Sequence, residues 1–67
     1  MFLKLMHGDD LFELIGNVRK CSFERVGGAS IVRVTLQDGS TFQHQLSGNA
    51  FVMNDDGKTV ERYVLSV

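Results

Sequence analysis

Short segments in which apolar and polar residues alternate, separated by glycine-containing turns, most constrain the fold of this chain. Over residues 32–36 valine and leucine alternate with arginine and threonine, and Asp38-Gly39 follows directly. A period of two is typical of a half-buried β-strand. Asp-Gly between two such segments predicts a type I′ turn, in which both central residues have positive φ. The sequence therefore predicts a β-hairpin whose return strand covers residues 40–46.

Other segments have the same strand-like composition, rich in β-branched and aromatic residues and bounded by glycine, asparagine or aspartate. These strands are expected over residues 2–6, 18–26, 50–53 and 59–67.

Residues 9–16 allow two structures. Asp10 and Glu13 have capping-box spacing, and Gly16 is a suitable residue to follow a short helix. Alternatively, the segment is a strand that pairs with residues 2–6 across the turn at 7–10. The predicted fold is all-β: a small antiparallel meander or barrel-like sheet of five or six short strands, with one short helical turn at residues 9–16 as the alternative.

The length of 67 residues leaves room for one small β domain, residues 1–67. A chain of this size buries only about 60% of the surface that it exposes when unfolded. Proteins this small are usually stabilised further by disulfides, a metal or a partner subunit. Cys21 is the single cysteine, so an internal disulfide is excluded. We therefore expect a homo-oligomer, favoured also by the absence of proline, which often blocks sheet edges.

The lone cysteine is typical of a reducing compartment, so a cytoplasmic location is expected. The sequence has no secretory signal and no run of about 20 apolar residues that could span a membrane. Membrane association is therefore not expected.

Motifs for catalysis or metal binding are weak. Gly57-Lys58-Thr59 resembles the end of a phosphate-binding P-loop, but Val52 stands where that loop needs a glycine. Val52 also stands where a calcium loop around Asp55-Asp56-Gly57 needs a carboxylate. His7, His44 and the cysteine are far apart and fall short of the four ligands of a structural zinc site. The sequence predicts no catalytic residue, no cofactor and no metal.

Arginine outnumbers lysine on the expected strands, and its planar guanidinium can contact a carboxylate or phosphate at two points. Neutral amides and an aromatic residue accompany the arginines. An ordinary solvated sheet face would have a similar composition. If these residues bind a ligand, the expected binding residues are Arg19, Arg25, Arg33, Gln43, Gln45, Asn49, Arg62 and Tyr63.

The charge balance argues against nucleic acid as the partner. Seven basic residues stand against eight acidic ones, for a net charge of −1, and the basic residues are spread along the chain. Binding to a phosphate backbone instead needs several cations on one surface.

The second half of the chain, residues 34–40 and 48–60, resembles short open reading frames of bacteriophages and prophages. The resemblance implies a phage accessory protein in the host bacterial cytosol, a class that includes inhibitors and sponges for nucleotide signals. The predicted function is a non-enzymatic, oligomeric anti-defence protein that sequesters a small anionic, nucleotide-like molecule between protomers. The alternatives are an inhibitor that binds a host defence protein through a sheet edge or face, and a small nucleic-acid-binding phage module.

Overall fold

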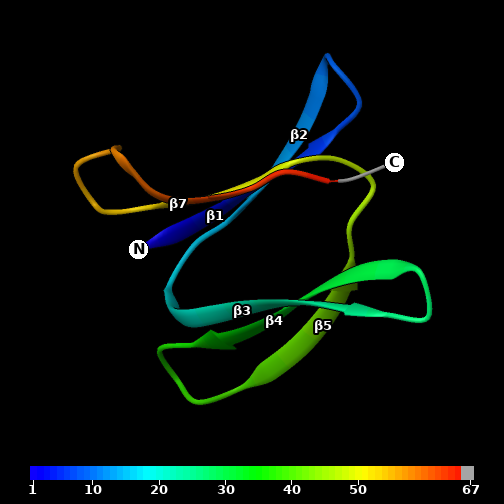
Figure 1. Ribbon diagram of the computed structural model, residues 1–67. Helices are drawn as coiled ribbons and strands as arrows, with labels where there is room; N and C mark the ends of the chain where they lie inside the picture. Colours follow the sequence, from blue (N-terminus) through cyan, green and yellow to red (C-terminus); the bar gives the residue numbers. More distant parts are fainter. Residues whose placement is uncertain (66–67) are drawn as a thin grey trace.

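The computed structural model describes residues 1–65, which form seven strands and no helix (Figure 1). All strand pairs are antiparallel, so the expected fold class is confirmed. The strands are β1 (Phe2–His7), β2 (Leu11–Ile15), β3 (Val18–Val26), β4 (Ala29–Leu36), β5 (Thr41–Gln45), β6 (Ala50–Met53) and β7 (Thr59–Tyr63).

The strands form two open sheets rather than one meander or a closed barrel. One sheet has the order β2-β1-β6-β7, and the other has the order β3-β4-β5. We call them the four-stranded and three-stranded sheets. Figure 1 shows them facing each other as two layers. Because β1 lies between β2 and β6, strands from opposite ends of the chain are neighbours, which a simple meander does not allow.

The segment at residues 9–16 is a strand, and the helical alternative is wrong. It pairs with β1 in a register that runs from Leu3 opposite Ile15 to His7 opposite Leu11. A helix of about seven residues is marginal in water, whereas pairing with β1 satisfies the backbone of both strands. Asn17, in the left-handed region at φ 56°, then leads the chain into the three-stranded sheet.

The hairpin over β4 and β5 is confirmed, but its turn is not type I′. Only Gly39 has a positive φ there, at 91°, and its N–H donates to the carbonyl of Leu36. This geometry is a longer turn ending in a left-handed glycine. Two adjacent positive-φ residues, as type I′ requires, occur instead at Gly27 and Gly28 between β3 and β4.

The last expected strand is confirmed only in part. It covers Thr59–Tyr63 as β7, whereas Val64 and Leu65 are not in a strand. Residues 66–67 of the expected strand lie outside the described residues. Within residues 1–65 there is no helix that is long and apolar enough to cross a membrane.

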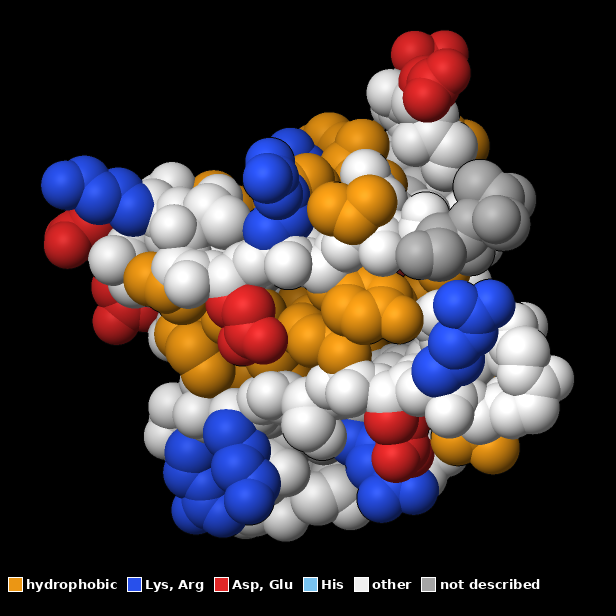
Figure 2. Space-filling model, viewed as in Figure 1, with side chains coloured by type: hydrophobic (Ala, Val, Ile, Leu, Met, Phe, Trp, Pro, Cys, Tyr) orange, Lys and Arg blue, Asp and Glu red, His pale blue; other side chains and the backbone are white. Residues whose placement is uncertain are grey.

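The core fills the space between the two sheets. Both sheets contribute their inward-facing positions, which alternate with exposed ones as a period of two requires. Figure 2 shows hydrophobic side chains between the two layers, with charged groups around them. The buried hydrophobic residues are Leu3, Leu5, Val18, Val32, Val34, Leu46, Ala50 and Val52.

Candidate functional site

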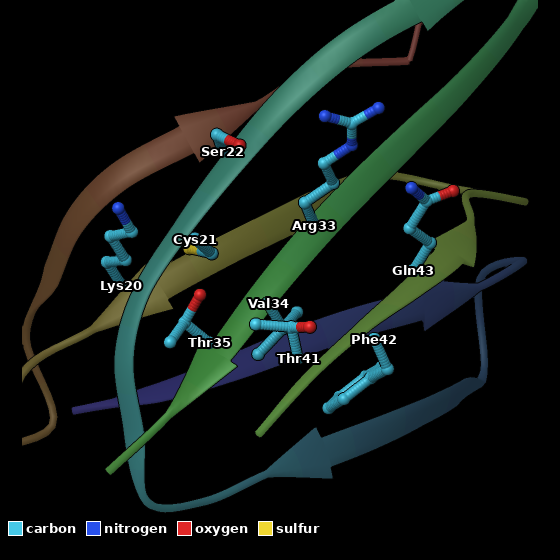
Figure 3. A pocket seen from close by; sticks show the side chains of 9 residues that line it. All are labelled: Lys20, Cys21, Ser22, Arg33, Val34, Thr35, Thr41, Phe42 and Gln43. Carbon is cyan, nitrogen blue, oxygen red and sulfur yellow. The ribbon is translucent and has the colours of Figure 1, made fainter. Parts of the chain in front are cut away.

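The outer face of the three-stranded sheet carries a hollow with a volume of about 740 Å³. Three consecutive residues from each strand line it. Figure 3 shows these residues, which are Lys20, Cys21 and Ser22 of β3, Arg33, Val34 and Thr35 of β4, and Thr41, Phe42 and Gln43 of β5.

Strand register arranges the polar side chains of this hollow in two rows across the sheet. Ser22 lies opposite Arg33, which lies opposite Gln43. The neighbouring row consists of Lys20, Thr35 and Thr41. Alternation turns the residues between these rows, including the buried Val34, toward the core. The outer face thus presents two cations, three hydroxyls and one amide.

Arg33 is held by an acidic neighbour on the same face. Its Nη2 lies 2.9 Å from Oε1 of Glu24. Oε1 of Glu24 is shielded from solvent but has no hydrogen bond of good geometry. The contact is therefore an ion pair and not a bidentate hydrogen-bonded pair. The Arg33 side chain remains 57% exposed. Exposed pairs of this kind contribute only about 0–1 kcal/mol, so the guanidinium can exchange Glu24 for a stronger anionic partner.

Cys21 contacts the hollow but is not an activated nucleophile. Burial raises the pKa of its thiol above the ordinary 9.0, and the negative charge of Glu61 raises it further. Because the thiolate is the reactive form, these surroundings lower the reactivity of the sulfur at neutral pH.

Of the eight residues expected to bind ligand, Arg33 and Gln43 lie together in the hollow. Gln45 is exposed two residues beyond Gln43 on β5, where it shares the same sheet face. Arg19 and Arg25 are exposed on β3 outside the lining, with Arg19 at an irregularity in the pairing with β4.

The remaining three expected residues lie elsewhere. Asn49 lines a smaller hollow of about 390 Å³, and its Oδ1 accepts a hydrogen bond from the backbone N–H of Leu65. Arg62 lies opposite Phe51 on the four-stranded sheet. The eight residues therefore do not converge on one site within a single chain.

Tyr63, also expected to bind a ligand, is half-buried and makes contacts within the protein. Its ring stacks on Phe23 with centroids 4.9 Å apart and an interplanar angle of 13°. Its hydroxyl lies 3.1 Å from Oγ of the buried Ser30. These contacts join the two sheets, so Tyr63 has a structural role.

Sequence reasoning missed Lys20, Ser22, Thr35 and Thr41 as lining residues. The alternation of residues along each strand could have identified them, because a period of two places all four on the same sheet face as Arg33 and Gln43. It also missed a cluster in which His7, Glu13 and His44 each offer a ligand atom, all within 4.8 Å of one another. No local pattern reveals this cluster, because its members come from β1, β2 and β5.

Comparison with protein-family models, curated proteins and solved structures finds no match for this chain.

Proposed function

We propose that this chain is a non-catalytic binding protein for a small, nucleotide-like molecule with a phosphate group, held on the outer face of the three-stranded sheet. The observation that carries the proposal is the row formed by Arg33 and Gln43, next to the row that contains Lys20. Two cations and a neutral amide on one hollow face suit a phosphate with a polar substituent attached.

The chemistry of the lining supports binding rather than turnover. The hydroxyls of Ser22, Thr35 and Thr41 can donate hydrogen bonds to phosphate oxygens or accept them from a sugar. The thiol is kept protonated, as its raised pKa indicates. Sequestration requires these contacts and needs no reactive side chain.

Self-association is part of the proposal. A hollow of about 740 Å³ is large enough for a small ligand, but it lies on one sheet of a very small domain. A second copy laid against it would complete the enclosure. Sequestration of a nucleotide signal by such an oligomer is the activity that the resemblance to phage accessory proteins implies.

The test is a thermal-shift and calorimetric screen with inorganic phosphate, adenosine diphosphate, cyclic dinucleotides and ADP-ribose. We expect at least one phosphate compound to raise the melting temperature and to be recovered intact after the protein is denatured. Arg33→Gln should weaken that binding by about 10-fold to 100-fold, since a charged hydrogen bond contributes roughly 1.5–3 kcal/mol.

Arg62→Gln is the matched control, because it removes the same charge from an exposed strand position on the other sheet. It should leave the affinity unchanged. Equal losses in the two variants would place the ligand elsewhere. Recovery of a converted compound would show turnover and contradict a non-catalytic function.

A second candidate function, inhibition of a host protein, is favoured by β2. This strand lies at the edge of the four-stranded sheet, and its Leu11, Phe12 and Leu14 are 69%, 53% and 57% exposed. An apolar edge strand can extend the sheet of another protein. Light scattering after size-exclusion chromatography measures the mass of the chain alone and after incubation with host lysate proteins. A self-assembled sponge gives a homo-oligomer in both samples, whereas an inhibitor gives a stoichiometric complex with a host protein.

A further inference from the structure

The inward faces of three strands bring two imidazoles and a carboxylate together at one margin of the sandwich. His7 lies near the end of β1, Glu13 lies on β2, and His44 lies on β5 of the opposite sheet. One ligand atom from each lies within 4.8 Å of the others. The two imidazole rings meet edge to face, with centroids 6.1 Å apart and an interplanar angle of 61°.

We propose that His7, Glu13 and His44 form a zinc site that ties the two sheets together. Two imidazole nitrogens and one carboxylate oxygen are a known ligand set for a tetrahedral zinc with water in the fourth position. Ligands about 2.0–2.2 Å from a tetrahedral zinc lie roughly 3.4 Å apart. Nε2 of His7 and Oε1 of Glu13 are 3.6 Å apart, close to that spacing.

A second contact orients His7 for this role. Its Nδ1 lies 2.8 Å from Oγ of Ser47, on the side of the ring away from Glu13. When Nδ1–H donates to Ser47, the lone pair of Nε2 points toward the Glu13 carboxylate. Metal-bound histidines are usually held in this way by a hydrogen bond from the second ring nitrogen. In that tautomer Nε2 of His7 and Oε1 of Glu13 are both acceptors, so they cannot hydrogen-bond to each other and a cation between them would satisfy both.

The exposure of the cluster suits ion entry. The side chains of His7 and Glu13 are 34% and 49% exposed, and His44 is half-buried. An aqueous zinc ion can therefore reach the ligands and keep a bound water. Because β1 and β2 belong to one sheet and β5 to the other, the bound ion would crosslink the layers. Very small domains commonly gain stability from such a metal.

The test is a titration of the metal-free full-length chain with zinc chloride in competition with a chromogenic chelator. We expect one zinc per chain and a rise in melting temperature on saturation. Glu13→Gln and His44→Gln should each weaken binding by at least about 10-fold. Ser47→Ala should weaken it by about 10-fold, as is typical when a metal-bound histidine loses the hydrogen-bond partner of its other ring nitrogen.

Two matched variants separate this site from incidental zinc binding. Cys21→Ser removes the thiol, and Glu24→Gln removes a carboxylate from the other face of the three-stranded sheet. Both should bind zinc as the wild type does. In nitrogen-detected spectra of the folded wild-type chain, zinc should shift the ring resonances of both histidines together.

An ordinary ion pair between His7 and Glu13 makes the opposite predictions. It would leave the ring resonances unchanged at millimolar zinc, and Glu13→Gln would perturb only His7. Either unchanged resonances or wild-type zinc affinity in Glu13→Gln and His44→Gln would overturn the proposal. The lining of the hollow on the three-stranded sheet does not include His7, Glu13 or His44. The outcome of the zinc titration is therefore independent of the proposed function.

Discussion

Leu5 and Leu14 are two leucines of the four-stranded sheet whose replacement by alanine should have very different effects. Leu5 on β1 is 1% exposed and belongs to the core, whereas Leu14 on the neighbouring β2 is 57% exposed. The chemical change is the same, and both side chains lie on strands of the same sheet. The pair therefore isolates the contribution of burial between the sheets.

Leu5→Ala should cost about 3 kcal/mol of unfolding free energy, within the 2–5 kcal/mol typical of buried leucines. The core of a domain this small rarely supplies more than about 3–5 kcal/mol in total. With a urea dependence of about 1 kcal/mol per molar, the midpoint should fall by roughly 3 M. The Leu5→Ala variant should therefore retain only about 0–2 kcal/mol of unfolding free energy and unfold at low urea concentrations. Leu14→Ala should change stability by less than about 0.5 kcal/mol.

Urea unfolding followed by circular dichroism, at several protein concentrations, measures both variants. A fall of less than about 1 M for Leu5→Ala would refute the assignment of the core to the space between the sheets. A loss for Leu14→Ala as large as that for Leu5→Ala would refute the exposure of β2 in solution. If that loss shrank on dilution, β2 would be buried against a second copy.

Three further predictions concern local features. Gly48→Ala should cost about 2 kcal/mol or more in urea unfolding, because the added methyl would collide with the backbone carbonyl oxygen of Met6. Hydrogen bonds from the hydroxyl and backbone N–H of Ser40 hold the pKa of Asp38 below its ordinary 3.8. A carbon-detected NMR titration of Asp38 should therefore give a midpoint below 3.8, and Ser40→Ala should raise that midpoint. Cys21 should react slowly with a disulfide reagent at pH 8 while folded, and at the rate of a free thiol in urea.

The direction of each pH effect follows from linkage. Because the pKa of Asp38 is lowered in the folded state, its stabilising contribution is complete above about pH 4 and is lost as the pH falls through the folded pKa. The pKa of Cys21 is raised, so its contribution is complete below about pH 9 and is lost as the pH rises through the folded pKa. Opposite slopes would contradict the hydrogen bonds and burial described.

Controls for these experiments are available in the chain. Gly16→Ala should be tolerated, because a Cβ there meets no atom within 4 Å and the residue has no positive φ. A loss equal to that of Gly48→Ala would contradict the steric explanation. Fast modification of folded Cys21 at pH 8 would show that its thiol is exposed and activated. That result would contradict the raised pKa and favour a catalytic role for Cys21.

Strand positions were predictable where local signals agree. The strand at Val18–Val26 and the short strand at Ala50–Met53 occur as expected, because each combines strand-forming residues with glycine, asparagine or aspartate at a boundary. Residues 9–16 could not be assigned, because capping and pairing signals overlap there. Pairing with β1 decided the outcome, and no local pattern contains that information.

The hollow was predictable only in part. Arg33 and Gln43 lie on consecutive strands of one hairpin, so local register places them side by side. Arg62 is equally basic and also on a strand, but it belongs to the other sheet. Which sheet a strand joins depends on packing between segments far apart in the chain, which the alternation of residues does not encode.

By itself, the amino-acid sequence determined an all-β chain with short antiparallel strands, most of their boundaries and the polar row of the central hairpin. Only the tertiary structure decided the division into two sheets, the insertion of β1 between β2 and β6, and the meeting of His7, Glu13 and His44. The physical reason is that a period of two records which face of a strand is apolar. The identity of the neighbouring strand is decided by how apolar faces pack together once the whole chain has collapsed.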